Sequence, residues 1–454
     1  MNEKIQKLYG WMKEQGIKSK ITVKESYGLG LFANAKKGET VLSVPKNLII
    51  NRTNSLKFFE QSPLKFENFP FLLAPNSPEI QRFAILLYLT HLIYNPTPYS
   101  ALLPREIKSP LGWDTQSVEF QLLASTGLDL AIKGKKAVLQ EEYNVLEFRM
   151  GEEIYTLVEY LYLSRSMSLV ENEEDKKKQE DWIGIIPVLD FCNHSFTPNA
   201  NWEIKKDTVD LILLEDVDGE VFINYGPKPN NELLFIHGFI LEDNECKLSS
   251  YAPLVEYPDD EVTIWEKGSI MTERGWGTRL QIGHYDPSHQ DNLLPDVPVE
   301  IQVLLSGILD MRSLQILSLC ALRKEDGLHK RGDKIYFKDK EENFKGRPVP
   351  YEKTKLIRFI NGFFIHFLEE LDQELEDSIE QTPNVKAVLY LRSQLVELLN
   401  FNVLILHEMF IKEDNSDEEG TSINPEEKVD AGDKDKLDLE RLVEALDLKA
   451  TETD

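Results

Sequence analysis

The sequence predicts an α+β fold in which short strands are split by a helical insert and followed by a mostly α-helical C-terminal domain. Two observations support this fold class. Short apolar runs bounded by glycine and proline turns lie in residues 21–50 and 182–240, as is typical of strands. Between them, and again after about residue 300, apolar residues recur at helical spacing over longer windows.

The first predicted element is a helix over residues 3–16, where Ile5, Leu8 and Trp11 share one face and Gly16 is the expected C-cap. The runs "EIQRFAILLYLTHLIY" and "EEIYTLVEYLYLSRSMSLV" predict helices in the insert. The segments "IGIIPVLDF", "NWEIKKDTVDLILLEDV" and "EVFINYG" then predict strands. Three long helices are expected in the segments that begin at "IQVLLSGILD", "KLIRFINGFF" and "NVKAVLYLRS".

These patterns divide the chain into five predicted segments. Residues 1–77 and 181–245 are expected to form two parts of one domain, with 78–180 as the helical insert, 246–411 as a helical domain and 412–454 as a tail. The tail carries 16 acidic and 6 basic side chains, a net charge of −10, which predicts disorder. The polar run "ENEEDKKKQEDW" near the end of the insert predicts a solvated loop.

Charge and cysteine content restrict the function further. The net charge of −27, from 51 basic and 78 acidic residues, argues against a general nucleic-acid binder and favours basic protein partners. Only Cys192, Cys246 and Cys320 are present, so a disulfide framework or a cysteine-rich zinc site is not favoured. With few cysteines, no signal-peptide pattern and no apolar run of membrane-spanning length, we expect a cytoplasmic protein, also present in the nucleus, that does not contact membranes. We also expect a monomer.

The stretch "VLDFCNHSFTPNANW", residues 188–202, combines polar and reactive side chains at the end of an apolar run that predicts a buried strand. A Cys192–His194 nucleophile pair is not favoured, because residues two apart on a strand lack the lateral placement of a dyad. Metal binding would need further ligands at suitable spacing, and none cluster in the sequence. The local pattern alone favours a different interpretation, in which Asn193 and His194 are polar caps that bond to nearby backbone.

Two other segments are ambiguous when each is taken by itself. In "YGLGLFA", Gly28 and Gly30 lack the third glycine of a dinucleotide fingerprint, because position 33 is Ala. The glycines predict either a turn with positive φ or a close approach of backbone to a ligand. In "EVFINYGPKPNNELLFIHGF", Tyr225 follows an apolar strand, where a tyrosine is usually packed with its hydroxyl hydrogen-bonded.

The order of these segments resembles that of a SET domain, the lysine-methyltransferase fold: "YGLGLFA", "YLSRS", "IPVLDFCNHSFTPN", then "EVFINYGPKPNNELLFIHGF". The helical insert and helical C-terminal region resemble the Rubisco-methyltransferase-like branch, over about residues 1–410. The resemblance implies S-adenosylmethionine as cofactor and no metal. By this resemblance, Tyr27, Gly28 and Leu29 contact the cofactor through their backbone, and Arg165 contacts it through its guanidinium. The other residues expected at the cofactor are Asn193, His194 and the active-site tyrosine, Tyr225.

The resemblance also implies three substrate-binding residues, with Asp190 near the target-lysine channel and His237 and Phe239 in the substrate pocket. Two positions depart from the branch: residue 27 is Tyr where Glu is frequent, and residue 237 is His where Tyr is frequent. A backbone contact at Tyr27 would be unaffected. His237 could change the number of methyl groups or the nucleophile accepted, or could have no catalytic part.

The principal hypothesis is an S-adenosylmethionine-dependent protein-lysine N-methyltransferase acting on a non-histone protein, with ribosomal proteins and translation factors as candidate substrates. A first alternative is a protein-histidine methyltransferase of the same fold. A second is a catalytically weak SET-fold interaction module, and a third is an adaptor that works through its acidic tail. The residue types at Asn193, His194, Tyr225 and Arg165 favour an enzyme over the interaction module. Activity retained after deletion of residues 412–454 would exclude the adaptor.

Overall fold

The computed structural model describes residues 2–61, 76–124, 126, 128–146, 151–170, 181–226 and 228–242, and shorter stretches beyond them. Two compact units are present: Met1–Gly112 with Leu139–Lys228, and Trp113–Val138 with Pro229–Asp454. The shorter stretches are 244, 248–252, 299–303, 327–331, 334–337, 340–341, 365, 368, 371 and 379–397.

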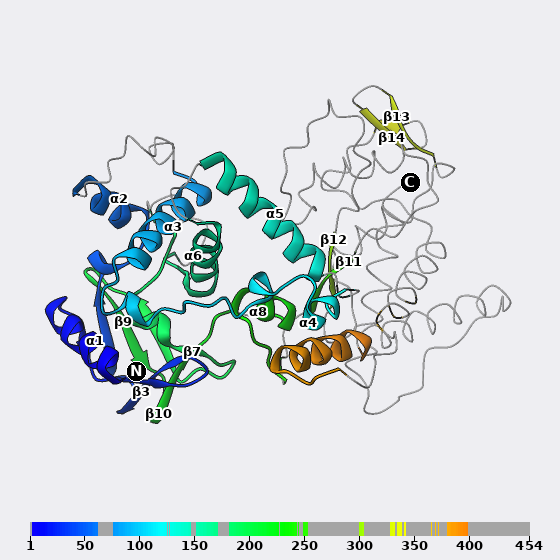
Figure 1. The fold of residues 1–454 in the computed structure, drawn as a ribbon. Helices are drawn as coiled ribbons and strands as arrows, with labels where there is room; N and C mark the ends of the chain where they lie inside the picture. The colour runs from blue at the N-terminus through cyan, green and yellow to red at the C-terminus, as the bar shows by residue number, and fades with distance from the viewer. Residues whose placement is uncertain are drawn as a thin grey trace, which may run out of the picture. The chain divides into compact units, whose positions relative to one another are not determined.

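Two four-stranded sheets form the β part of the first unit (Figure 1). One has the order β1-β4-β9-β8, and its strands pair antiparallel. The other has the order β2-β3-β10-β7, and in it only the β10–β7 pair is parallel. The strands are β1 Lys18–Ser19, β2 Thr22–Glu25, β3 Leu29–Ala35, β4 Thr40–Pro45, β7 Asn193–His194, β8 Ala200–Ile204, β9 Thr208–Leu213 and β10 Val217–Ile223, with β5 Met167–Ser168 and β6 Ile183–Gly184 as a separate pair.

Alternation of apolar residues explains these strands. In β9, Val209, Leu211 and Leu213 are buried while the residues between them are partly exposed, because successive side chains point to opposite faces of a sheet. The predicted strand "NWEIKKDTVDLILLEDV" is a hairpin, since β8 and β9 pair from Ala200↔Leu213 to Ile204↔Val209.

Helices of the insert form where the sequence predicts them. In α3 (Pro78–Tyr94), the Ser77 side chain accepts a hydrogen bond from the Ile80 N–H, and Pro78 occupies the first turn, where its missing N–H costs nothing. Helix α3 packs against both α2 and α6. The α-helices from the N-terminus to residue 165 are α1 Asn2–Glu14, α2 Arg52–Gln61, α3, α4 Val118–Gln121, α5 Leu128–Leu146 and α6 Glu152–Arg165.

The strand predicted to end at Asp190 is wrong. The run "IGIIPVLDF" does not continue as a strand to Asp190, because the strand β6 is short and Leu189–Phe191 form a 3-10 turn. Val188 precedes this turn with a positive φ of 72°. The segment is fully buried, so its apolar run carries no periodicity that could distinguish a strand from a turn.

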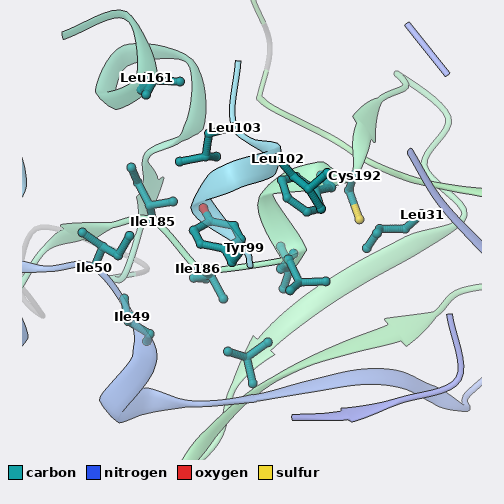
Figure 2. Packing of buried hydrophobic residues seen from close by; sticks show 14 of the residues in the cluster. Leu31, Ile49, Ile50, Tyr99, Leu102, Leu103, Leu161, Ile185, Ile186 and Cys192 are labelled. Carbon is teal, nitrogen blue, oxygen red and sulfur yellow. The ribbon is translucent and has the colours of Figure 1, made fainter. Parts of the chain in front are cut away.

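The core of the first unit is one cluster of buried apolar residues contributed by α1, both sheets, α3 and α6. Figure 2 shows the Tyr99 ring among buried aliphatic side chains that include Leu102, Leu103 and Ile186. Each fully buried leucine, such as Leu31, contributes about 1.5–3 kcal/mol relative to an exposed position. This core supports the strand ends at which the polar residues of the next section lie.

The described part of the second unit contains α4, residues 128–138 of α5, α8 (Asn230–His237), a helical stretch over residues 383–397, and five strands. Arg392 is buried, and its Nη1 donates to the carbonyl oxygens of Leu122 at 3.1 Å and Ala124 at 3.3 Å. The strands are β11 Leu248–Ala252, β12 Val299–Val303, β13 Leu328–Arg331, β14 Lys334–Phe337 and β15 Lys340–Glu341.

Part of the predicted C-terminal organisation differs from the structure. The segment expected to begin a helix at residue 301 begins as β12, which pairs antiparallel with β11. Most of the first two predicted C-terminal helices, the polar loop 171–180 and the acidic tail 412–454 lie outside the described residues. The predicted five-segment division therefore stays a prediction. Within the described ranges, no helix combines the length and apolar content that a bilayer crossing requires.

Candidate active site

Strand pairing in the first unit brings together three segments that are far apart in the sequence. In the register of the parallel pair β7–β10, Phe222 lies opposite Asn193 and Ile223 opposite His194. On its other side, β10 pairs with β3, which begins directly after the glycine-rich turn. The sheet therefore places the turn, the Asn-His pair and the strand leading to Tyr225 in adjacent positions (Figure 1).

The glycine-rich turn has an unusual backbone. Tyr27 has φ of 47° and Gly28 has φ of 130°, and the Ser26 N–H donates to the Gly28 carbonyl at 3.2 Å. The Tyr27 side chain is 98% exposed, so it is not held by packing. A positive φ is costly for a residue with a Cβ, and the turn must be held by contacts from elsewhere.

Asn193 supplies part of that support. Its Nδ2 donates to the Ser26 carbonyl at 3.1 Å and to Glu220 Oε1 at 2.6 Å. Glu220 Oε2 accepts from Ser26 Oγ at 2.6 Å. Asn193 thus lies against the turn. Its bond to the Ser26 carbonyl agrees with the interpretation as a polar cap, and its place beside the glycine-rich turn agrees with the interpretation as part of a ligand site.

His194 and Tyr225 form a second contact. His194 Nδ1 accepts a hydrogen bond from the Tyr225 backbone N–H at 3.0 Å, and the two rings stack with centroids 5.0 Å apart. Burial lowers the pKa of His194, and this favours the neutral ring. With Nδ1 as the acceptor, the proton of the neutral ring is assigned to Nε2, which is buried without a hydrogen-bond partner in the described residues.

The Tyr225 hydroxyl donates to the backbone carbonyl of Cys192 at 2.6 Å. Burial raises the pKa of Tyr225 well above its usual value, so the hydroxyl stays protonated at neutral pH. Burial likewise raises the pKa of the Cys192 thiol, and a protonated buried thiol is a poor nucleophile. The geometry therefore makes the Tyr225 hydroxyl a positioned polar group and gives no support to a thiol enzyme.

Asp190 and Arg165 form a buried ion pair. Arg165 Nη1 donates to Asp190 Oδ2 at 2.8 Å and to the Asp190 carbonyl at 3.0 Å, and the Tyr99 hydroxyl donates to Oδ2 at 2.9 Å. The Asp190 side chain has no exposed area. Although burial by itself lowers the pKa of Arg165, the Asp190 carboxylate raises it, so the guanidinium stays charged.

Atoms of this pair remain without partners in the described residues. Arg165 Nε and Asp190 Oδ1 are buried and make no hydrogen bond there. The Arg165 guanidinium, predicted to reach the cofactor carboxylate, thus already donates to Asp190 through Nη1, and its Nε has no acceptor among the described residues. The expected cofactor role of Arg165 and substrate role of Asp190 stay predictions.

The remaining predicted substrate residues belong to the second unit. His237 is the last residue of α8, which Gly238 ends in a left-handed conformation, and the rings of His237 and Phe239 lie 5.8 Å apart. Their substrate roles stay predictions. Among the residues the structure describes, no three His, Cys, Asp or Glu side chains are arranged to hold a metal ion.

Sequence reasoning missed three contributors to the site: Ser26, Tyr99 and Glu220. Glu220 lies in the predicted strand "EVFINYG", but strand periodicity gives no indication that its carboxylate reaches a turn almost 200 positions earlier. Tyr99 lies in a short connecting segment with no pattern of its own, and only the folded core brings its hydroxyl to Asp190.

Sequence comparison relates this chain to known proteins. The SET domain family matches residues 28–226. SET domain-containing protein 8 of Schizosaccharomyces pombe is 28% identical over 269 residues, covering 56% of this chain and 61% of that protein. Mouse N-lysine methyltransferase SETD6 is 24% identical, covering 50% and 52% respectively. The zebrafish actin-histidine N-methyltransferase is also 24% identical, over 48% of this chain and 38% of that protein. The alignments thus span less than two thirds of each relative.

Solved structures extend the likeness beyond the SET segment. The SET domain of LSMT bound to lysine and AdoHcy superposes with a TM-score of 0.64 and 15% identity, covering 91% of this chain and 93% of that one. Rubisco LSMT bound to sinefungin and monomethyllysine gives a TM-score of 0.61 with the same coverage. The predicted α+β class is confirmed by this likeness. Residues 28–226 thus match the SET domain family, and the chain shares its fold with these LSMT structures.

Proposed function

We propose that this chain is an S-adenosylmethionine-dependent protein-lysine N-methyltransferase that acts on a non-histone protein. The observation that carries the proposal is the convergence of three elements beside strands β3, β10 and β7: the Ser26–Gly30 turn, the Asn193-His194 pair and the half-buried Tyr225. Mouse SETD6, a relative by sequence, is named as an N-lysine methyltransferase, and an LSMT structure holds lysine with AdoHcy.

The site residues fit this cofactor. A Cβ added at Gly28 would meet no atom within 4 Å, so the backbone there is open to a ligand. His194 Nε2 and Arg165 Nε are buried donors without partners in the described part of the chain, and a nucleoside and a carboxylate provide the acceptors that such donors need. When bound, S-adenosylmethionine supplies an electrophilic methyl group on a sulfonium.

The target amine must arrive neutral and aligned. A free lysine has a pKa of about 10.4, so deprotonation at neutral pH costs about 4–5 kcal/mol. Exclusion of water lowers that pKa. The hydroxyl of Tyr225 and the carbonyl of Cys192, which already bond to each other, would orient the amine, and such positioning accounts for most of the rate enhancement.

A histidine-directed enzyme of the same fold is the second candidate. The observation that favours it is the relative named actin-histidine N-methyltransferase. His237, at a position where the branch often has tyrosine, is the residue whose replacement tests it. The test compares wild type and His237→Tyr on lysine and histidine versions of one identified substrate. A change in which version is methylated would show that this position selects the nucleophile.

The first experiment combines purified protein, labelled S-adenosylmethionine and an acceptor-depleted lysate from cells that lack this gene. Wild type should transfer label to a discrete protein, and Tyr225→Phe should transfer far less. Tyr9→Phe is the matched control, because the Tyr9 hydroxyl also bonds to backbone, accepting from the Val23 N–H at 2.8 Å, and lies outside the proposed site. Equal transfer by wild type and Tyr225→Phe would refute the assigned role of Tyr225, and no cofactor binding at all would refute the proposed function.

The acidic surplus supports a basic protein partner, with ribosomal proteins and translation factors as the candidates to test first. The sequence pattern also supports a cytoplasmic and nuclear location and a monomeric state. Microscopy of a tagged protein and light scattering test these two proposals. Deleting residues 412–454 tests whether the acidic tail contributes to activity.

A further inference from the structure

Three segments meet at one carboxylate that the proposed mechanism does not use. Glu220 extends from β10 and accepts hydrogen bonds from Ser26 Oγ and Asn193 Nδ2, both at 2.6 Å. Asn193 Nδ2 also donates to the Ser26 carbonyl at 3.1 Å, which closes the cluster. A single side chain thus connects the glycine-rich turn to the Asn-His pair.

Gly30 is the residue that gives this carboxylate its space. A Cβ at Gly30 would overlap Glu220 Oε1 and would lie 3.1 Å from Ser26 Cβ. Gly30 has no positive φ, so its lack of a side chain is required by the close approach of Glu220 rather than by backbone conformation.

The turn itself must be stabilised by contacts with other segments. Tyr27 has a positive φ and its side chain is almost fully exposed, so packing of this residue cannot keep the backbone in place. Bonds that involve a carboxylate are stronger than those between neutral groups, and two of them end on Glu220.

We propose that Glu220 is a positioning residue that fixes the Ser26–Gly30 turn against Asn193 before the cofactor binds. The inference rests on the proposed function only in its consequence for cofactor affinity. Its structural part, a turn held by the Glu220 carboxylate, concerns the protein without any ligand. A turn formed in advance avoids the ordering cost that binding would otherwise bear.

The test measures two quantities in the full-length chain. The first is amide hydrogen exchange in residues 26–30 of the cofactor-free protein, and the second is the Kd for S-adenosylhomocysteine by calorimetry. Glu220→Ala should speed exchange in the turn and weaken binding, each by about tenfold. Asp218→Ala is the matched control on the same strand, because it removes one cross-strand bond, from Asn34 Nδ2 at 2.9 Å, without touching the turn.

Two further variants separate geometry from charge and protect the test against misfolding. Glu220→Gln keeps a group that can bond to both Ser26 and Asn193 but loses the charge, so its effects on exchange and affinity should be clearly smaller than those of Glu220→Ala. Gly30→Ala should displace the carboxylate and reproduce the effect of Glu220→Ala. In the Glu220→Ala background the same glycine change should add little, because the two substitutions break one shared contact.

The outcomes distinguish this inference from the proposed function. Exchange in residues 26–30 that is unchanged by Glu220→Ala overturns the positioning role, as does a Glu220→Gln variant that behaves like the alanine variant. If Glu220→Ala does not fold, Gly30→Ala and Ser26→Ala decide the same question. Failure of wild type to bind S-adenosylhomocysteine would overturn the proposed function, while the exchange comparison would still decide the role of Glu220.

Discussion

Replacing Asp190 by asparagine tests the buried ion pair at the centre of the first unit. The Asp190 side chain has no exposed area, and the Arg165 side chain is 18% exposed. Asparagine has nearly the same shape, so the substitution removes the negative charge and leaves the packing in place. The Arg165 guanidinium would then keep its bond to the backbone carbonyl of residue 190, and the neutral amide would leave its charge without a counter-ion.

The structure sets the size of the effect. Removing one partner of a buried ion pair costs about 3–5 kcal/mol, because the other charge stays desolvated and uncompensated. The remaining bond to the carbonyl and the partial exposure of Arg165 place the expected loss near the lower limit, about 3 kcal/mol. Tyr99→Phe removes one donor to the same carboxylate and should cost about 1.5–3 kcal/mol.

The assay is urea unfolding followed by circular dichroism, with the free energy of unfolding compared between wild type and variant. Asp216→Asn is the control, because Asp216 and Lys36 form a pair of similar length with side chains 60% and 77% exposed, and its loss should be unmeasurable. If Asp190→Asn costs less than about 1 kcal/mol, the pair is not the buried, uncompensated interaction that the contacts describe.

Three further outcomes follow from the site. Tyr225→Phe should lower kcat at least tenfold. It should destabilise the fold by only about 1 kcal/mol, because it loses one hydrogen bond to the Cys192 carbonyl. An unchanged kcat would contradict this prediction. Burial lowers the pKa of His194, so its contribution to stability is present above the unfolded value of about 6.5 and is lost as the pH falls through the folded pKa. The decline in unfolding free energy below about pH 6.5 should therefore be smaller in His194→Gln, and an equal decline would argue against this assignment. Finally, Cys192 should resist a thiol reagent until urea unfolds the chain, in a background with Cys246→Ser and Cys320→Ser; rapid labelling of the folded protein would contradict its burial.

Local patterns determined much of this protein. Alternating apolar residues specified strands such as β9, and the cap-forming pair Ser77-Pro78 specified where α3 begins, because both features depend on neighbouring residues alone. The order of the Gly-rich, Asn-His and Tyr-Gly segments was enough to predict a SET domain, and the SET domain family matches residues 28–226.

Tertiary structure decided the rest, because the deciding contacts join residues far apart in the chain. The 3-10 turn at Asp190 replaces a predicted strand, and a buried apolar run cannot reveal that difference by periodicity. Tyr99 and Glu220 were not anticipated, since each acts on a partner at least 90 positions away. Side-chain type and local spacing specify which residues can form a strand or a turn, whereas the pairing of β10 with β3 and β7 determines which of those residues meet at the site.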